Sequence, residues 1–159
     1  MSNVAIIGAG YVGLTTAACL AHIGHNVTCA DIDENKISRL NDGEIPIHEA
    51  RLPELVQEGL SNQLLKFVVG AKRAITASEF VFLCLPTPQG EDGKADIGAV
   101  IDVVEEIRQL VLPQTIIINK STVPIGTIAA IETAIQREDA PVVPNPELLT
   151  EGVAVTDRL

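Results

Sequence analysis

The fold is decided by residues 3–31, which read NVAIIGAGYVGLTTAACLAHIGHNVTCAD. An apolar strand runs into a turn with the spacing Gly8-x-Gly10-x-x-Gly13, an alanine-rich helix follows, and a second strand ends at Asp31. Gly8 permits a tight turn, and Gly10 lets the backbone approach a pyrophosphate. Gly13 lets the helix pack closely on the strand. The stretch therefore predicts a dinucleotide site.

Asp31 stands 18 residues after Gly13, where an acid accepts hydrogen bonds from an adenosine ribose. The free N–H groups and positive dipole end of the helix favour phosphates. A plain glycine turn between core strands is the alternative, but strand, helix and acid all stand where the motif requires them. Asp31 favours NAD, because its charge repels the extra phosphate of NADP and no Arg occurs at 32–35. The positive charge of Lys36 argues against this preference for NAD, unless Lys36 is only a solvated charge on the surface of a helix.

The amino-acid composition limits the class of protein to which this chain can belong. The 159 residues are 47% hydrophobic and 20% charged, a balance typical of one globular domain. Aromatic residues make up only 3%, so the core must consist of Val, Ile, Leu and Ala, as parallel sheets usually do. A net charge of −10 argues against nucleic acid and anionic membrane surfaces as partners.

No apolar run approaches the roughly 18 residues that span a bilayer, and the chain begins directly with a strand, without a signal-peptide pattern. Cys19, Cys29 and Cys84 are odd in number, lie in predicted core elements and fit no metal-site spacing. We therefore expect reduced, buried thiols, no bound metal and a cytoplasmic protein.

Strands and helices alternate through the rest of the chain. Periodicity and turn residues predict strands at 65–69, 80–85, 115–118 and 141–143, and helices at 34–40, 53–60, 71–78, 97–112 and 126–136. Residues 89–96 are predicted to be a polar loop. This alternation indicates an α/β fold, a Rossmann-type doubly wound parallel sheet in a single domain.

Ligands of such sheets lie beyond the carboxyl ends of the strands. Turn-forming or polar clusters follow five predicted strands, at residues 8–13, 31–33, 86–88, 121–124 and 145–151. Taken singly, each Pro or Ser has an alternative role as a simple strand terminator. Together the clusters predict one site along that edge.

The clusters resemble the NAD-binding domain of the UDP-glucose/GDP-mannose dehydrogenase family over essentially the whole chain. The Ser-Thr-Val-Pro and Asn-Pro-Glu segments, in this order, are far more specific than the glycine motif. Residues 86–93 are most similar to the UDP-glucose branch. The matching segments are Gly8–Leu14, Asp31–Asp33 with Lys36, Leu40–Gly43, Ile45–Ile47, Leu85–Pro88, Lys120–Thr127 and Asn145–Glu147.

The resemblance implies oxidation of a sugar C6 alcohol to a carboxylate with two NAD, through an aldehyde and a cysteine thioester that is then hydrolysed. It implies that Thr122 and Glu151 are catalytic and organise the hydrolytic water. Their alternative roles are structural, Glu151 opening a short helix and Thr122 capping one. By the same resemblance NAD contacts Gly8, Gly10, Tyr11, Val12, Gly13, Asp31, Lys36, Pro86, Thr87, Thr122 and Glu151, and the nucleotide sugar contacts Glu147, Leu148, Leu149, Thr150 and Glu151.

The sequence also departs from the family pattern. Thr150 stands where the family usually has Arg, and residues 48–52 read His-Glu-Ala-Arg-Leu where it usually has Tyr-Glu-Pro-Gly-Leu. The final strand of the NAD domain, the middle helical domain and the C-terminal sugar-nucleotide domain with its catalytic cysteine have no counterpart in residues 1–159. We therefore expect a fragment or truncated relative, inactive alone, whose partner is the missing C-terminal half.

Several functions stay open. The first is the NAD-binding domain of an enzyme that oxidises UDP-glucose to UDP-glucuronate. The alternatives are a non-catalytic NAD-binding or regulatory module, or a dehydrogenase for UDP-N-acetylmannosamine or GDP-mannose. A 6-phosphogluconate or hydroxyacyl-CoA dehydrogenase is disfavoured by residues 121–124 and 145–147. The sequence leaves open which nucleotide sugar is the substrate, and whether the protein is a homodimer.

Overall fold

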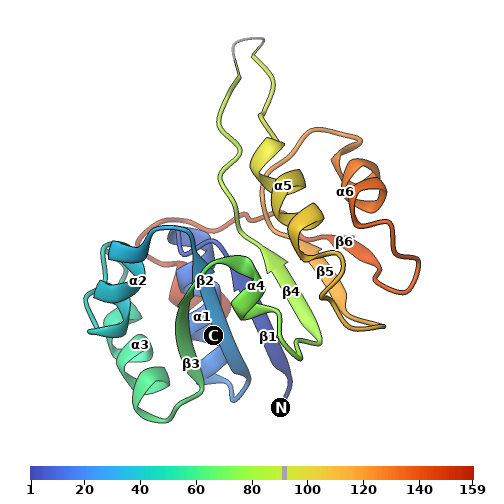
Figure 1. Cartoon of the computed structure of the whole chain (residues 1–159). Coiled ribbons are helices and arrows are strands. Elements are labelled where there is room, and N and C mark those ends of the chain that lie inside the picture. Colours follow the sequence, from blue (N-terminus) through green and yellow to red (C-terminus); the bar gives the residue numbers. More distant parts are fainter. Residues whose placement is uncertain (91–92) are drawn as a thin grey trace.

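The computed structural model describes residues 1–90 and 93–159, and within them the strands form one six-stranded parallel sheet (Figure 1). The strand order is β3-β2-β1-β4-β5-β6, with β1 paired to both β2 and β4. This is the Rossmann order, so the predicted fold is confirmed. The strands are β1 (Asn3–Ile7), β2 (Asn26–Asp31), β3 (Leu65–Val69), β4 (Phe80–Leu83), β5 (Ile116–Asn119) and β6 (Val142–Pro144).

Helices cover both faces of the sheet, because parallel strands are joined by crossovers and the chain passes from edge strand β3 back to β4 beside β1 before it forms the second half of the sheet. The core on one face gathers apolar residues of α1 (Tyr11–His22), α2 (Glu34–Asn41), α3 (Leu52–Ser61) and α7 (Ala154–Arg158). The opposite core gathers those of α4 (Ala71–Ala74), α5 (Gly98–Ile107) and α6 (Thr127–Ile135). The helices predicted at 34–40, 53–60 and 126–136 are thus confirmed.

Two predicted helices are too long. The helix predicted at 71–78 ends at Ala74, and Ala77 has a left-handed φ of 61° that no helix continues through. The helix predicted at 97–112 ends at Ile107, although Val111 stays buried and satisfies the apolar spacing from a turn. In both cases the apolar pattern correctly predicted which residues are buried, but it overestimated the length of the helix.

The strand ends also differ slightly from the predictions. The strand predicted at 80–85 ends at Leu83, where Lys120 N donates to Leu83 O at 2.9 Å and closes the ladder. The polar loop predicted at 89–96 is joined at its base by a bridge between Gln89 and Ala95, and its residues 91–92 lie outside the described residues. No helix in the described part of the chain is long and apolar enough to cross a membrane.

Candidate functional site

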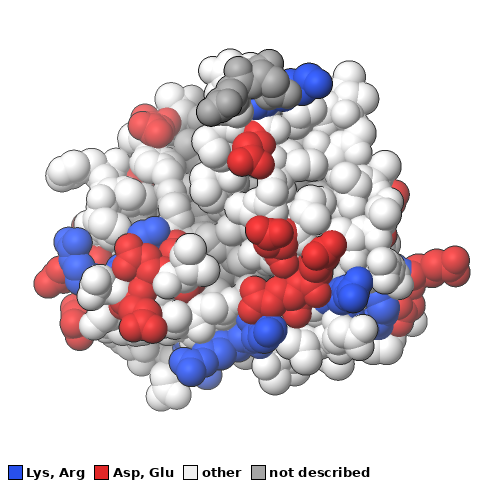
Figure 2. Space-filling model, turned by 45° about the horizontal axis from the view of Figure 1, so that its top comes forward, with Lys and Arg blue, Asp and Glu red and all other residues white. Residues whose placement is uncertain are grey.

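A cavity of about 720 Å³ opens at the carboxyl ends of β1, β2 and β4. It lies at the point where the strand order reverses, which is where α/β sheets bind ligands. Figure 2 brings this edge of the sheet forward, and Asp and Glu side chains gather on both sides of a hollow. Seven of the predicted cofactor residues line the cavity, namely Gly8, Gly10, Tyr11, Val12, Asp31, Lys36 and Pro86.

The glycine-rich turn shows three separate roles. Gly8 has a φ of 102°, and a Cβ there would lie 2.4 Å from Cys84 O. A Cβ on Gly13 would lie 1.8 Å from Gly8 O, so this glycine lets α1 press against the turn. Gly10 has an ordinary φ of −80°, and a Cβ there would meet nothing within 4 Å. Gly8 and Gly13 therefore serve the fold, whereas the open space at Gly10 is available to a ligand.

The Asp31 carboxylate ties the end of β2 to that turn. Its Oδ2 accepts hydrogen bonds from Ala9 N and Lys36 Nζ, both at 2.9 Å, and its Oδ1 accepts from Asp33 N at 3.1 Å. Burial alone would raise the pKa of Asp31, but these donors outweigh burial and lower the pKa. Lys36 is thus paired with Asp31 and is not the solvated charge considered from the sequence.

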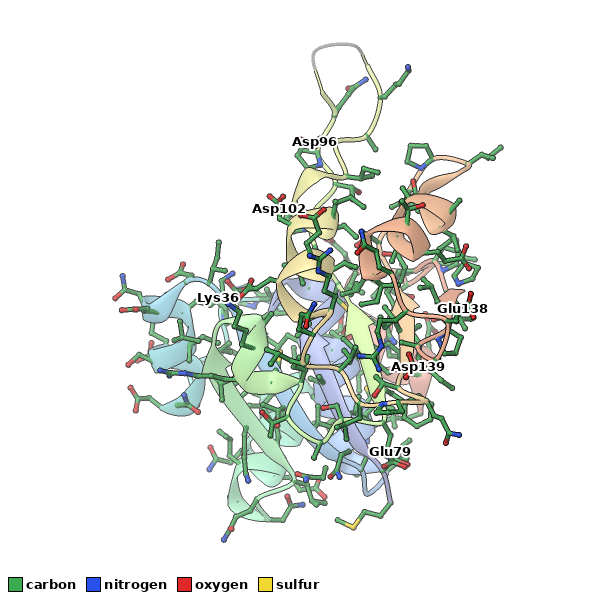
Figure 3. All side chains as sticks on the ribbon, turned by 45° about the vertical axis from the view of Figure 1, so that its right-hand side comes forward. Lys36, Glu79, Asp96, Asp102, Glu138 and Asp139 are labelled. Atoms are coloured by element: carbon green, nitrogen blue, oxygen red, sulfur yellow. The ribbon has the colours of Figure 1, made fainter. Side chains whose placement is uncertain are left out.

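The far wall of the cavity comes from α5, which sequence reasoning did not assign to the site. Ala99, Asp102, Val103 and Glu106 line it. Figure 3 shows Lys36 on α2 and Asp102 on α5, the helices that contribute these two parts of the lining. A stripe of apolar and acidic residues on a surface helix gives no local signal of a binding site. The role of α5 becomes clear only in the folded chain, where the crossover places this helix beside the cavity.

Thr87 and Thr122 lie beyond the ends of β4 and β5, and the described lining does not include them. Thr87 Oγ1 donates to Thr122 O at 2.9 Å, and Ser121 Oγ donates to Leu85 O at 2.7 Å, so the two strand exits are joined. Thr122 is exposed, and α6 begins only at Thr127 after Gly126. The suggestion that Thr122 caps a helix is therefore wrong.

Glu147 is committed to donors of the protein itself. Its Oε1 accepts from the amides of Leu148 and Leu149 at 3.0 and 3.1 Å, and its Oε2 accepts from Lys120 Nζ at 3.1 Å and from Arg158. Burial raises its pKa, but the Lys120 and Arg158 cations more than offset this and lower it. The neighbouring Leu148, Thr150 and Glu151 are exposed, so these side chains face solvent from a segment that Glu147 pins.

Glu49 is a functional candidate that the sequence did not reveal. It is 6% exposed, and its carboxylate accepts hydrogen bonds from the Tyr11 hydroxyl, Gly152 N at 2.8 Å and Val155 N at 3.2 Å. The carboxylate that holds the start of α7 is therefore Glu49, not Glu151, which lies in the preceding turn. Two signals in the sequence could have pointed to it: an acid between the apolar residues Ile47 and Leu52, and the glutamate that residues 48–52 share with the family pattern Tyr-Glu-Pro-Gly-Leu.

The three cysteines are buried free thiols, as the sequence predicted. Burial raises the pKa of each thiol, and that of Cys84 reaches about 12. A thiol is nucleophilic only as the thiolate, so none of these three is suited to attack a substrate.

Comparison with known proteins gives a consistent result. Residues 2–159 match the family described as "UDP-glucose/GDP-mannose dehydrogenase family, NAD binding domain". The chain is similar to UDP-glucose 6-dehydrogenase TuaD of Bacillus subtilis, with 40% identity over 100% of this chain and 36% of that protein. UDP-glucose 6-dehydrogenase of Rhizobium meliloti is 42% identical over 98% of this chain and 37% of its own length.

The solved structures agree. A ternary complex of GDP-mannose dehydrogenase from Pseudomonas aeruginosa superposes with a TM-score of 0.88 at 34% identity, covering 98% of this chain and 38% of that one. UDP-glucose dehydrogenase from Pyrobaculum islandicum gives a TM-score of 0.87 at 32% identity, covering 99% of this chain and 38% of its own. The chain thus spans little more than a third of the length of the relatives it matches.

Proposed function

The chain belongs to the UDP-glucose/GDP-mannose dehydrogenase family as its NAD-binding domain, and from this premise we propose that it supplies the NAD half of an enzyme that oxidises UDP-glucose to UDP-glucuronate. The single observation that supports this most is the cavity in which the open face of Gly10 and the carboxylate of Asp31 lie together. The choice of UDP-glucose rests on the relatives of about 40% identity, which are UDP-glucose 6-dehydrogenases.

The residues present fit NAD. The pyrophosphate would approach the turn at Gly10, where a Cβ would stand in its way, and would meet the N–H groups at the start of α1. Asp31 Oδ1 accepts one amide and has a further lone pair for a ribose hydroxyl. The extra phosphate of NADP would meet this carboxylate, and Lys36, which lies beside it, is already paired with it. When bound, NAD supplies the hydride acceptor.

In this proposal, the segment 147–151 forms the side of the site that faces the nucleotide sugar. Because the Glu147 carboxylate is engaged by Lys120 and Arg158, we assign it to holding the segment in place. The exposed Leu148, Thr150 and Glu151 would face the nucleotide sugar. Glu151 and Thr122 both follow sheet strands at their carboxyl ends, and there a carboxylate can take a proton from water while a hydroxyl orients it.

The thioester step needs an activated thiolate. Cys19, Cys29 and Cys84 are buried, with raised pKa values. We therefore propose that the nucleophile comes from outside residues 1–159, and that these residues alone form no UDP-glucuronate from UDP-glucose. The partner is then the remaining two-thirds that the relatives possess.

Two chimaeras test the proposal. In one, this chain replaces the matching 36% of UDP-glucose 6-dehydrogenase TuaD; in the other, it replaces the matching 38% of the Pseudomonas aeruginosa GDP-mannose dehydrogenase. We expect NADH formation from UDP-glucose in the first chimaera, and formation slower by about tenfold or more at subsaturating NAD when the same chimaera carries Gly10→Ala. Activity only in the second chimaera, with GDP-mannose, would overturn the choice of substrate. Bound NAD without turnover in either would favour the non-catalytic module.

A further inference from the structure

Three segments far apart in the sequence meet around the buried carboxylate of Glu49, in a cluster that we call the Glu49 junction: Tyr11, Glu49, and the amides of Gly152 and Val155. Tyr11 is the first residue of α1, Glu49 lies between α2 and α3, Gly152 lies in the turn before α7, and Val155 lies in the first turn of α7. The single Gly152 N–H is shared between Tyr11 Oη at 2.7 Å and Glu49 Oε2 at 2.8 Å. The Tyr11 hydroxyl in turn donates to Glu49.

The junction is saturated with hydrogen bonds. A buried carboxylate is costly unless donors surround it, and Glu49 is 6% exposed. Burial pushes its pKa up, but the Tyr11 hydroxyl and the amides of Val155, Gly152 and Ala154 outweigh burial and bring the pKa below its ordinary value. The geometry therefore holds an ionised carboxylate among donors from two distant segments.

Both segments that Glu49 joins belong to the proposed site. Tyr11 directly follows Gly10 and lines the dinucleotide cavity. Gly152 directly follows Glu151, and α7 carries Arg158, which contacts Glu147. The segment 147–151 is thus held at one end by Lys120 and Arg158 and at the other by the Glu49 junction.

We propose that Glu49 and Tyr11 are positioning residues that tie the segment 147–152 to the glycine-rich turn, so that dinucleotide binding at the turn and order in this segment stabilise one another. This rests on the proposed function, since the turn must bind NAD. The physical route is short: a phosphate on the N–H groups at the start of α1 fixes Tyr11, and the Tyr11 hydroxyl fixes Gly152. Such coupling is reciprocal by thermodynamic linkage.

Hydrogen exchange of the full chain with and without saturating NAD tests the proposal. We expect NAD to slow exchange in peptides covering residues 8–16 and also in those covering 149–157. In Tyr11→Phe, which keeps the ring and removes only the hydroxyl, protection at 8–16 remains and the added protection at 149–157 is lost. The Kd for NAD rises about threefold to tenfold, as the loss of one or two hydrogen bonds predicts.

Two further variants separate positioning from simple stability. Glu49→Gln keeps the shape of the side chain and removes its charge, and it should raise the Kd as Tyr11→Phe does. Glu54→Gln alters an exposed glutamate in the first turn of α3 and should match the natural chain in both readouts. A Tyr11→Phe chain with a lower Tm but an unchanged Kd and undiminished NAD protection at 149–157 would mean a structural role only.

The outcomes also separate this inference from the proposed function. NAD protection at 8–16 without any at 149–157 in the natural chain would overturn the coupling and leave NAD binding intact. The absence of protection at both places would overturn both.

Discussion

The substitution Gly10→Ala should separate binding from folding. Gly10 lies at the turn before α1 with a φ of −80°, which alanine adopts without strain, and the added Cβ would meet nothing within 4 Å. The same methyl group would occupy the space through which a pyrophosphate reaches the helix N–H groups. The change therefore tests whether that open space is a ligand site.

Gly10→Ala has two opposite effects on the free energy of unfolding, and these nearly cancel. Replacing glycine by alanine at a compatible φ stabilises a protein by about 0.4–1 kcal/mol, because the unfolded chain has fewer conformations. Gly10 is also the N-cap of α1, and alanine is poorer there than glycine by roughly 0.5–1 kcal/mol. We expect the free energy of unfolding to change by less than about 0.5 kcal/mol, which corresponds to a Tm shift of at most about 2 °C.

The effect on binding is much larger. Hydrogen bonds to a charged group contribute about 1.5–3 kcal/mol each, so losing one phosphate contact weakens NAD binding by about tenfold to more than a hundredfold. Calorimetric titration with NAD gives the Kd, and urea unfolding gives the stability. Gly13→Ala is the contrasting variant, since its Cβ would lie 1.8 Å from Gly8 O and must destabilise the fold itself by about 1–3 kcal/mol or more. A Gly10→Ala chain that binds NAD within twofold of the natural chain would refute the reasoning.

Three further predictions follow from other parts of the structure. Arg51 has a left-handed φ of 65°, so Arg51→Gly should remove about 1–2 kcal/mol of backbone strain, while the greater entropy of the unfolded glycine chain costs about 0.5–1 kcal/mol. The Tm in a circular dichroism melt should therefore rise, and a lower Tm would contradict this. Asp31, Glu49 and Glu147 have pKa values lowered in the fold, so their contribution to the free energy of unfolding is complete above the ordinary carboxyl pKa of about 4 and is lost as pH falls through the lowered values. Urea midpoints should therefore be level between pH 7 and 5 and fall below pH 4, and a level profile down to pH 2 would contradict this. In the active chimaera, Glu151→Gln should slow turnover by about 10²- to 10⁴-fold and trap an acyl-cysteine visible by intact-protein mass spectrometry, and unchanged kcat would remove Glu151 from the hydrolytic step.

The sheet and the dinucleotide turn were predictable because their signals are local. The spacing of Gly8, Gly10 and Gly13 marks the turn within six consecutive residues, although the close approach that requires Gly8 is to Cys84 O after β4. The alternation of apolar strands and helices then limits the topology, since parallel strands need crossovers. These two features were enough to place Asp31 and Pro86 at the same cavity.

The tertiary contacts of the site were not predictable in this way. Glu49 is 103 residues from the Gly152 amide that it binds, and no local pattern marks a carboxylate that a distant helix will cover. The pairing of Lys36 with Asp31 depends on the side-chain conformations at the start of α2. The ends of α4 and α5 were missed because buried turn residues such as Val111 continue an apolar pattern without continuing the helix.

The central claim is that this chain binds NAD through the cavity beside Gly10 and Asp31. Calorimetric titration of the purified chain with NAD and, separately, with NADP tests it most directly. The structure predicts saturable one-to-one binding of NAD and weaker binding of NADP, because the extra phosphate would meet the Asp31 carboxylate while Lys36 is already paired. Binding of NADP as tight as that of NAD, or no saturable heat with NAD, would contradict the account.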